Sequence, residues 1–272
     1  MIKSLQQARD SGNPVILAGV GSGLTTKGAV RGGADLLAVY NTAVYRIRGL
    51  PTALAFLPYD NANQLTISTA PEVIANAGEV PVLLGFGAHD PRMPVDKLVE
   101  MAETFGAAGV TNEPFLGLYG NELRVQIENT GLGFNRELAL INHAVERNLL
   151  ALGWVFSVEE AIAMAKAGAQ IVGAMAGGIT AGGTAGGVQT STLDQAVNQI
   201  GSIVEAVKGI WKEILILGHG GPLVDPDSVA QVLRLTGADG YATGSSGERI
   251  PVEVGVAEAI RQFKSIDMTS DD

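Results

Sequence analysis

The sequence predicts a single (β/α)8 barrel of the α/β class, on three observations. The chain has 272 residues, close to the size of one closed α/β barrel, and no low-complexity linker divides it. Short apolar runs alternate with amphipathic stretches, and each run ends in Gly, Asn, Asp or His, as repeated βα units do. Eight such runs can be counted. We expect one domain over 1–272, with the barrel core in 15–264 and a flexible tail at 265–272.

The predicted strands are nearly continuous runs of Val, Leu, Ile and Ala, which is typical of parallel strands buried on both faces. The runs are short and bounded by turn residues, which favours strands over buried helices. The predicted strands span residues 15–21, 36–41, 80–87, 109–112, 149–156, 170–175, 214–219 and 240–244.

Helix signals lie between these runs. Ser157, with Glu160 three positions later, predicts a capping box, and Gly168 predicts the end of that helix. Prolines that suit the first turn of a helix predict three further helix starts, at Pro94, Pro226 and Pro251. The signals are weaker over 42–74 and 114–135, where we expect long loops on the active face.

The composition excludes several classes of function. A net charge of -10 with only 18 scattered Lys and Arg argues against a nucleic-acid partner. The absence of cysteine excludes disulfides, thiolate catalysis and thiolate metal sites. No apolar leader and no long apolar run is found, so we expect a cytoplasmic protein with no membrane partner.

Candidate catalytic residues follow from the rule that barrel enzymes work at the C-terminal ends of their strands. His219 ends the seventh run and is the candidate proton carrier; the alternative is a turn histidine bonded to a carbonyl. Asp90 is a candidate acid-base group or metal ligand; the alternative is a helix N-cap. Glu113 adds a carboxylate after the fourth run, so Asp90 and Glu113 are candidate ligands for a divalent metal, with Mg2+ favoured. The alternative is a transition metal held by one histidine and carboxylates.

The two loops that follow the seventh and eighth runs predict an anion site. HGGPL at 219–223 and GSSGERIP at 244–251 combine glycine-rich turns with helix starts, where backbone N–H groups bind phosphate or carboxylate. The alternative is an ordinary loop in which Glu248 and Arg249 pair in solvent. The candidate anion-binding residues are Gly220, Gly221, Ser245, Ser246 and Arg249.

An uncharged glycine-rich stretch covers residues 176–187, after the sixth run. Its length suggests a mobile lid, and the alternative is a loop ordered against a partner subunit. Together with several apolar stretches that look exposed, it predicts a homo-oligomer.

Absences narrow the mechanism further. No lysine falls at a strand end, which disfavours a Schiff-base aldolase. The three histidines are His89, His143 and His219, and His143 lies within a predicted helix, so a three-histidine zinc site is disfavoured.

Several segments taken together resemble the phosphoenolpyruvate hydrolase-like family, also called TIM-barrel signal transduction proteins, from about residue 15 to 263. The segments are GVGSG at 19–23, GGADLLAVYNTAVYRIRG at 32–49, LPYDNAN at 57–63, TNEP at 111–114, ENTGLGFNRELALI at 128–141, VFSVEEAIAMAKAGA at 155–169, GHGGP at 218–222 and GSSGERIPVE at 244–253. Within or beside them lie further candidate substrate-binding residues: Gly21, Ser22, Asn41, Arg46 and Asn112.

The resemblance implies a barrel related to the isocitrate lyase and phosphoenolpyruvate mutase group, whose members bind Mg2+ and stabilise enolates of small keto acids. The family pattern has QNFP and HMGLTTGG where this chain has TNEP and AGGITAGG, so Ala176 stands where a histidine is expected. We therefore expect an enzyme, a hydrolase or lyase, that cleaves a bond in a small anionic keto acid or enol ester through an enolate-type intermediate. The alternative is a non-catalytic binding or regulatory module on the same barrel.

Overall fold

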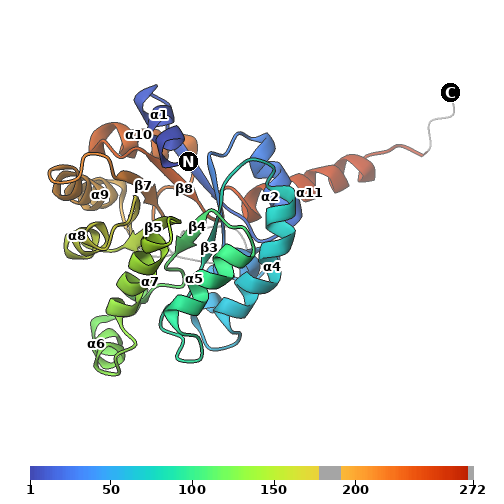
Figure 1. Cartoon of the computed structure of the whole chain (residues 1–272). Coiled ribbons are helices and arrows are strands. Elements are labelled where there is room, and N and C mark those ends of the chain that lie inside the picture. The colour runs from blue at the N-terminus through green and yellow to red at the C-terminus, as the bar shows by residue number, and fades with distance from the viewer. Residues whose placement is uncertain (178–190, 269–272) are drawn as a thin grey trace.

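Eight parallel strands close into one barrel, as the sequence predicts (Figure 1). The computed structural model describes residues 1–177 and 191–268. Each strand pairs with the next, and β8 pairs with β1. The strands are β1 Val15–Gly19, β2 Leu36–Val39, β3 Val82–Gly85, β4 Gly109–Thr111, β5 Leu150–Val155, β6 Ile171–Met175, β7 Leu215–His219 and β8 Gly240–Thr243.

The helices are α1 Ile2–Asp10, α2 Gly23–Arg31, α3 Asn41–Ile47, α4 Ala62–Asn76, α5 Val95–Thr104, α6 Asn121–Asn129, α7 Phe134–Glu146, α8 Val158–Lys166, α9 Leu193–Lys208, α10 Pro226–Thr236 and α11 Arg249–Lys264, with short 3-10 helices η1 Thr52–Phe56 and η2 Leu116–Leu118. Helix α1 precedes β1, α11 follows β8, and the other helices connect successive strands. None of these described helices has the length and apolar character needed to cross a membrane.

The predicted helix signals are mostly confirmed. Ser157 accepts a hydrogen bond from the Glu160 N–H at 3.2 Å, and α10 begins at Pro226. Two details differ. The Glu160 carboxylate accepts from the Phe156 N–H at 2.6 Å, so it caps the end of β5 and forms no capping box. Pro251 is the third residue of α11, because the helix already begins at Arg249.

The two segments expected to be long loops contain helices, which corrects the prediction. Residues 42–74 hold most of α3, η1 and most of α4, and residues 114–135 hold η2, α6 and the start of α7. Pro71 lies inside α4, and because proline usually interrupts a helix, it argued against a helix in this segment. Asn61 nevertheless caps α4 by accepting a hydrogen bond from the Gln64 N–H at 2.8 Å. Helix α6 buries no residue, and Leu123, Val125 and Ile127 are the apolar residues of its nine, so its sequence carries only a short helical signal.

The barrel interior is filled by alternate residues of each strand, and glycines make room for two large rings there. Tyr40 and Trp154 are almost fully buried in this inner core. A Cβ atom on Gly19 would lie 2.3 Å from the Tyr40 hydroxyl, and one on Gly85 would lie 2.5 Å from the Tyr40 Cβ. A Cβ on Gly173 would lie 2.1 Å from the Trp154 ring. The two rings therefore close the barrel directly beneath its mouth.

We expect Gly173→Ala to lower the free energy of unfolding by about 1–3 kcal/mol, the usual range for overpacking a tight core. The added methyl group would overlap Trp154 unless the ring or β6 moves. Gly28→Ala is the control, because no atom lies within 4 Å of its Cβ position on exposed α2. It should be neutral or stabilise by up to about 1 kcal/mol. Urea unfolding of both variants measures the difference, and equal stabilities would contradict this packing.

The outer faces of the strands form a second core with the surrounding helices. Side chains of α2, α4, α5, α7, α8, α9 and α10 pack into it, and no residue of α11 belongs to it. The C-terminal ends of the strands are thus held in a rigid ring.

Candidate active site

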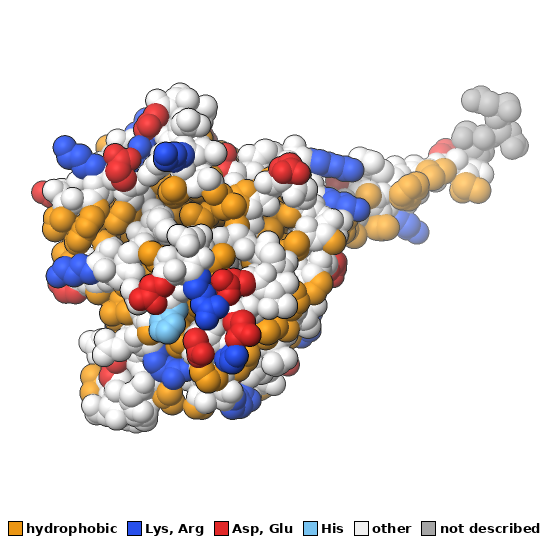
Figure 2. Space-filling model, viewed as in Figure 1, with side chains coloured by type: hydrophobic (Ala, Val, Ile, Leu, Met, Phe, Trp, Pro, Cys, Tyr) orange, Lys and Arg blue, Asp and Glu red, His pale blue; other side chains and the backbone are white. Residues whose placement is uncertain are grey.

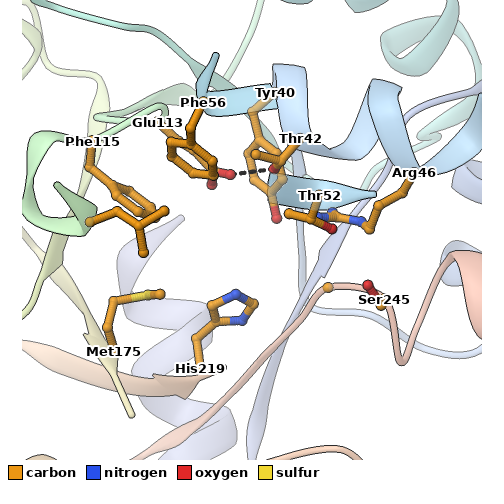
Figure 3. A pocket seen from close by; sticks show the side chains of 12 residues that line it. Tyr40, Thr42, Arg46, Thr52, Phe56, Glu113, Phe115, Met175, His219 and Ser245 are labelled. Carbon is orange, nitrogen blue, oxygen red and sulfur yellow. Dashed lines mark hydrogen bonds between the residues drawn. The ribbon is translucent and has the colours of Figure 1, made fainter. Parts of the chain in front are cut away.

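Side chains from five strand ends and their loops surround a small cavity in the mouth of the barrel (Figure 3). Its volume is about 30 Å3, which is room for roughly two water molecules. The lining residues are Tyr40, Thr42, Arg46, Thr52, Phe56, Glu113, Phe115, Leu118, Met175, His219, Gly244 and Ser245. Phe56 and Leu118, on the short helices η1 and η2, are part of this lining.

A buried ion pair joins two distant parts of the sequence at this cavity. Arg46 on α3 donates from Nε to Glu248 Oε2 at 2.7 Å, and the side chains are 4% and 0% exposed. Burial raises the pKa of Glu248 to about 7, although Arg46 and the Gly21 N–H lower it. Within the described residues, Arg46 Nη2 has no hydrogen-bond partner. A buried guanidinium N–H group without a partner suits an anionic ligand.

Glu113, which follows β4, contributes an acid-base group. It is 6% exposed, and the Thr42 hydroxyl donates a hydrogen bond to Oε1. Burial raises the pKa of Glu113 to about 7, while Thr42 and Arg46 lower it and Glu248 raises it. A carboxyl group with a pKa near the working pH is well matched to proton transfer.

His219 at the end of β7 lines the cavity with a defined tautomer. Its Nδ1 lies 2.7 Å from the Ala242 carbonyl oxygen, which can only accept, so Nδ1 carries the proton and Nε2 is the acceptor. Burial lowers the pKa of His219 to about 4, so the ring is neutral at pH 7. The Trp154 ring packs against it at 5.1 Å between centroids. His219 therefore bonds to a backbone carbonyl, as a turn histidine does, and it also lines the mouth cavity, as a catalytic histidine does.

Asp90 lies in a different cavity from Glu113, so the two predicted metal ligands are not brought together. Its carboxylate accepts from Arg92 Nε at 2.8 Å and Nη2 at 3.0 Å, and from Asn61 Nδ2 at 2.8 Å. The Arg92 hydrogen bonds lower the pKa of Asp90 to about 2. Asp90 is not the N-cap of α5 either, because that position is Pro94.

The donor set fits a resident divalent cation poorly. Within residues 1–177 and 191–268, no group of three His, Asp or Glu side chains is placed to hold a metal ion. Glu113 lines the cavity and Glu248 pairs with Arg46 beside it, and Thr42 and Arg46 already bind one oxygen of each carboxylate. We therefore assign no chemical step to a metal.

Four other predicted binding residues make contacts that hold the fold together: Gly21, Ser22, Asn41 and Asn112. Asn112 Oδ1 accepts from the Trp154 N–H at 2.7 Å, and its amide donates to Glu137. Asn41 donates to the Ala55 carbonyl at 2.8 Å. Ser22 caps α2, and Gly21 is packed so closely that a Cβ would lie 2.4 Å from the Ala43 oxygen. None of the four lines the mouth cavity.

The predicted anion loops are only partly assembled at the cavity. Ser245 lines it, whereas Ser246 lies 2.9 Å from the Tyr241 hydroxyl on the outer side of β8. Gly220 and Gly221 adopt positive φ angles of 79° and 54° beside the cavity lining and are not part of it.

The solvent-paired alternative for GSSGER is wrong, because Glu248 and Arg249 are 1% and 2% exposed and Glu248 pairs with Arg46. Of the glycine-rich stretch 176–187, residues 178–187 lie outside the described residues; Ala176 is buried at the end of β6.

Sequence reasoning missed Tyr40, Thr42 and Glu248. Tyr40 shares the inward alternation of Leu36 and Ala38 in β2, and this signal was available in the sequence. Glu248 was seen only as a partner for Arg249. Its true partner, Arg46, lies 202 positions away in the chain.

Comparisons with known proteins agree with this fold. The ToMV resistance protein Tm-1(GCR237) of Solanum lycopersicum is 36% identical over 269 residues, which cover 98% of this chain and 36% of that protein. This chain thus spans about a third of that relative's length.

Two solved structures share the barrel at low identity. A phosphonopyruvate hydrolase in complex with oxalate and Mg++ has a TM-score of 0.62 at 15% identity, covering 99% of this chain and 90% of that chain. The 2,3-dimethylmalate lyase, a PEP mutase/isocitrate lyase superfamily member, has a TM-score of 0.61 at 15% identity, covering 99% and 91%. These two show the fold.

The family follows from a match along nearly the whole chain. The model of the phosphoenolpyruvate hydrolase-like family matches residues 1–266, which include every strand and every described helix. This chain belongs to the phosphoenolpyruvate hydrolase-like family.

Proposed function

We propose that this protein is an enzyme that cleaves a bond beside the carbonyl of a small anionic keto acid or enol ester, through an enolate-type intermediate. The observation that carries the proposal is the meeting of Arg46, Glu113 and His219 around one buried cavity. The names of the two structural neighbours, a hydrolase of phosphonopyruvate and a lyase of a small dicarboxylate, support the substrate class.

In the proposed reaction Arg46 binds the negative charge. Its Nη2 has no described hydrogen-bond partner, so this N–H group can donate to a carboxylate or a developing oxyanion. The ion pair with Glu248 holds the guanidinium in place, and the Tyr40 ring supports it at 5.8 Å.

Glu113 moves the proton. In a hydrolysis it takes a proton from water as the water attacks the carbonyl, and in a retro-aldol cleavage it takes the proton of the substrate hydroxyl. The carbon–carbon bond then breaks toward the enolate, and the protonated Glu113 returns the proton to the enolate carbon. The carboxyl is suited to both steps, because its pKa of about 7 lets it be base and acid at neutral pH.

The sequence assigned proton transfer to His219, but the lowered pKa favours Glu113. A neutral imidazole with a pKa of about 4 is a weak base, so His219 Nε2 instead accepts a hydrogen bond that orients water or a substrate hydroxyl.

We expect His219→Asn to lower kcat/KM by about 10-fold, the scale of one neutral hydrogen bond. Asparagine can still donate to the Ala242 carbonyl in place of Nδ1 but has no atom at the Nε2 position. The shape of the pH–rate profile between pH 5 and 8 should stay unchanged. A loss above 100-fold together with a lost limb of that profile would make His219 the proton carrier after all.

The proposal is tested by a screen of 2-keto and β-diketo acids with detection of both products, run with Mg2+ and with a chelator. Turnover by the wild type that disappears in Glu113→Gln supports it. Equal slow decay of every substrate with both proteins would contradict it.

The second candidate is a non-catalytic binding module, and two observations favour it. The mouth cavity is only about 30 Å3, and helix α11 exposes several large apolar side chains. Absence of turnover across the screen, combined with saturable binding of an acid measured by calorimetry and lost in Arg46→Met, would establish this candidate in place of the enzyme.

A further inference from the structure

The mouth cavity has a charged end and an apolar end. In Figure 3, Arg46 and Ser245 lie on one side of the cavity, and Phe115 and Met175 lie on the other. His219 lies between the two sides. A molecule that spans the cavity therefore meets a cation with one end and apolar side chains with the other.

Packed aromatic rings form the apolar end. The Phe115 ring lies 5.5 Å from the Phe56 ring and 5.0 Å from the Phe156 ring, measured between ring centroids. Met175 and Leu118 belong to the same inner cluster. Phe115 and Met175 are 5% and 3% exposed. These side chains offer no hydrogen-bond donor, so a charge buried against them stays without a partner, which is costly, whereas an apolar group is stabilised there.

The charged end balances one negative charge. Among the described residues that line the cavity, Arg46 is the one cationic side chain, because the lowered pKa of His219 keeps its ring neutral at pH 7. Arg46 already shares its charge with Glu248, at 2.7 Å. Residues 178–190 and 269–272, which lie outside the described ranges, contain no Lys, Arg or His and so add no cation. A ligand with two negative charges therefore leaves at least one of them unbalanced.

The surface as a whole is acidic and does not change this balance. The net charge of the chain is -10. On the face shown in Figure 2, Lys and Arg side chains lie among Asp and Glu side chains and form no broad basic area. The field of an acidic protein does not attract anions. Each negative charge of a ligand thus needs its partner inside the cavity.

We propose that this site takes keto acids with one negative charge, whose carboxylate binds Arg46 and whose opposite end is an uncharged apolar group packed against Phe115 and Met175. The keto group rests on the proposed function, because it is the group that Glu113 and His219 would act on. The choice of one charge rests on the two ends of the cavity alone. Dicarboxylic and phosphonic keto acids place their second charge against the aromatic rings and are excluded.

Two inert acids of nearly the same shape isolate the effect of the second charge. In 3-methylbutanoate an isopropyl group replaces one carboxylate of malonate, and neither acid has a keto group that could be cleaved. We expect 3-methylbutanoate to bind at least about 10-fold more tightly than malonate, because the second carboxylate finds no partner. Calorimetric titration of the wild type with each acid, at pH 7.5 and constant ionic strength, measures both dissociation constants. Equal affinities, tighter binding of malonate, or no binding of either acid would overturn the proposal.

A lysine at the apolar end should reverse the preference. Leu118 lines the cavity and is only partly buried, so Leu118→Lys can place an ammonium group beside the far end of the ligand. We expect the ratio of the two dissociation constants to shift toward malonate by at least about 10-fold.

Leu57→Lys is the matched control for this shift. It adds the same charge next to Phe56, but Leu57 is 46% exposed and does not line the cavity. Its effect is screened by solvent, so the ratio should stay within about twofold of the wild type. No shift in Leu118→Lys, or an equal shift in both variants, would mean that the cavity does not select the charge, and would overturn the proposal.

This selectivity and the proposed function can fail separately, because binding is measured with acids that cannot be cleaved. Preference for 3-methylbutanoate with no turnover in the substrate screen would uphold the selectivity and remove the enzyme. Turnover of dicarboxylic keto acids in preference to monocarboxylic ones would uphold the enzyme and overturn the selectivity.

Discussion

Arg46→Met is expected to lower the free energy of unfolding by about 3–5 kcal/mol, the usual effect of removing one partner of a buried ion pair. The substitution leaves Glu248, whose side chain is 0% exposed, without its cation. It also removes the guanidinium that would hold the substrate, so turnover in the substrate screen should fall below detection.

The pH dependence of this loss has a definite sign. Burial holds the pKa of Glu248 at about 7, above its ordinary value of 4.5, so the folded state binds more protons than the unfolded state between these values. Stability therefore falls as pH rises through this window. Without Arg46 the pKa rises further, and the difference between variant and wild type should grow above pH 7.

Arg48→Met is the matched control, because Arg48 is 50% exposed and lies 3.7 Å from Asp60. It should change stability by less than about 1 kcal/mol. Urea unfolding at pH 6 and pH 8.5 measures both variants. Similar losses at the two positions would mean that the Arg46–Glu248 pair contributes little.

Glu113→Gln is expected to reduce kcat on the order of 1,000-fold, within the range for loss of a general base. Wild-type activity should rise with pH through about 7, because the ionised carboxylate is the active base. The residual activity of the variant should lack this rise, since glutamine does not titrate. Steady-state rates between pH 5 and 9 measure both effects.

Glu137→Gln separates catalysis from stability. Glu137 is also buried, and burial raises its pKa to about 8, but it bonds to Asn112 and the Leu116 N–H outside the cavity. The substitution should lower stability while activity per folded molecule stays within a few-fold of the wild type. An equal loss of kcat in both variants would remove Glu113 from the proposed chemistry.

The sequence predicted the strands well, because each one is a short apolar run between turn residues. The errors were at the strand ends, where predicted runs such as 15–21 continue past β1 Val15–Gly19 into the active loops. The residues just after a strand are as apolar or as small as strand residues, but in the structure they form the loop and the first turn of the next helix.

The candidate site was only partly predictable, and strand alternation explains the difference. His219 follows Leu215 and Leu217 on the inner face, so its position in the mouth was correct. Asn41 and Asn112 continue the outward alternation of Val39 and Val110, so they face the helices. Applied strictly, the same alternation would have selected Tyr40 in place of Asn41, and of the pair Asn112 and Glu113, both predicted, it would have kept only Glu113.

Long-range pairing lay beyond the sequence. No local sequence pattern links Arg46 to Glu248, because the two residues are 202 positions apart. The ion pair between Asp90 and Arg92, which are two positions apart, could have been predicted.

The rings of Tyr40 and Trp154, seated over inner-layer glycines, fill the barrel interior beneath the mouth, so the proposed substrate would enter and its products would leave on the mouth side. A molecule split in such a cavity cannot release its fragments from opposite ends. In the proposed cleavage the fragment nearer the opening leaves first, and the fragment held by Arg46 above Tyr40 leaves last. That last fragment competes with fresh substrate for the same empty site. In the proposed reaction the glycines of the inner layer, by admitting the two rings, would thereby set the order of product release.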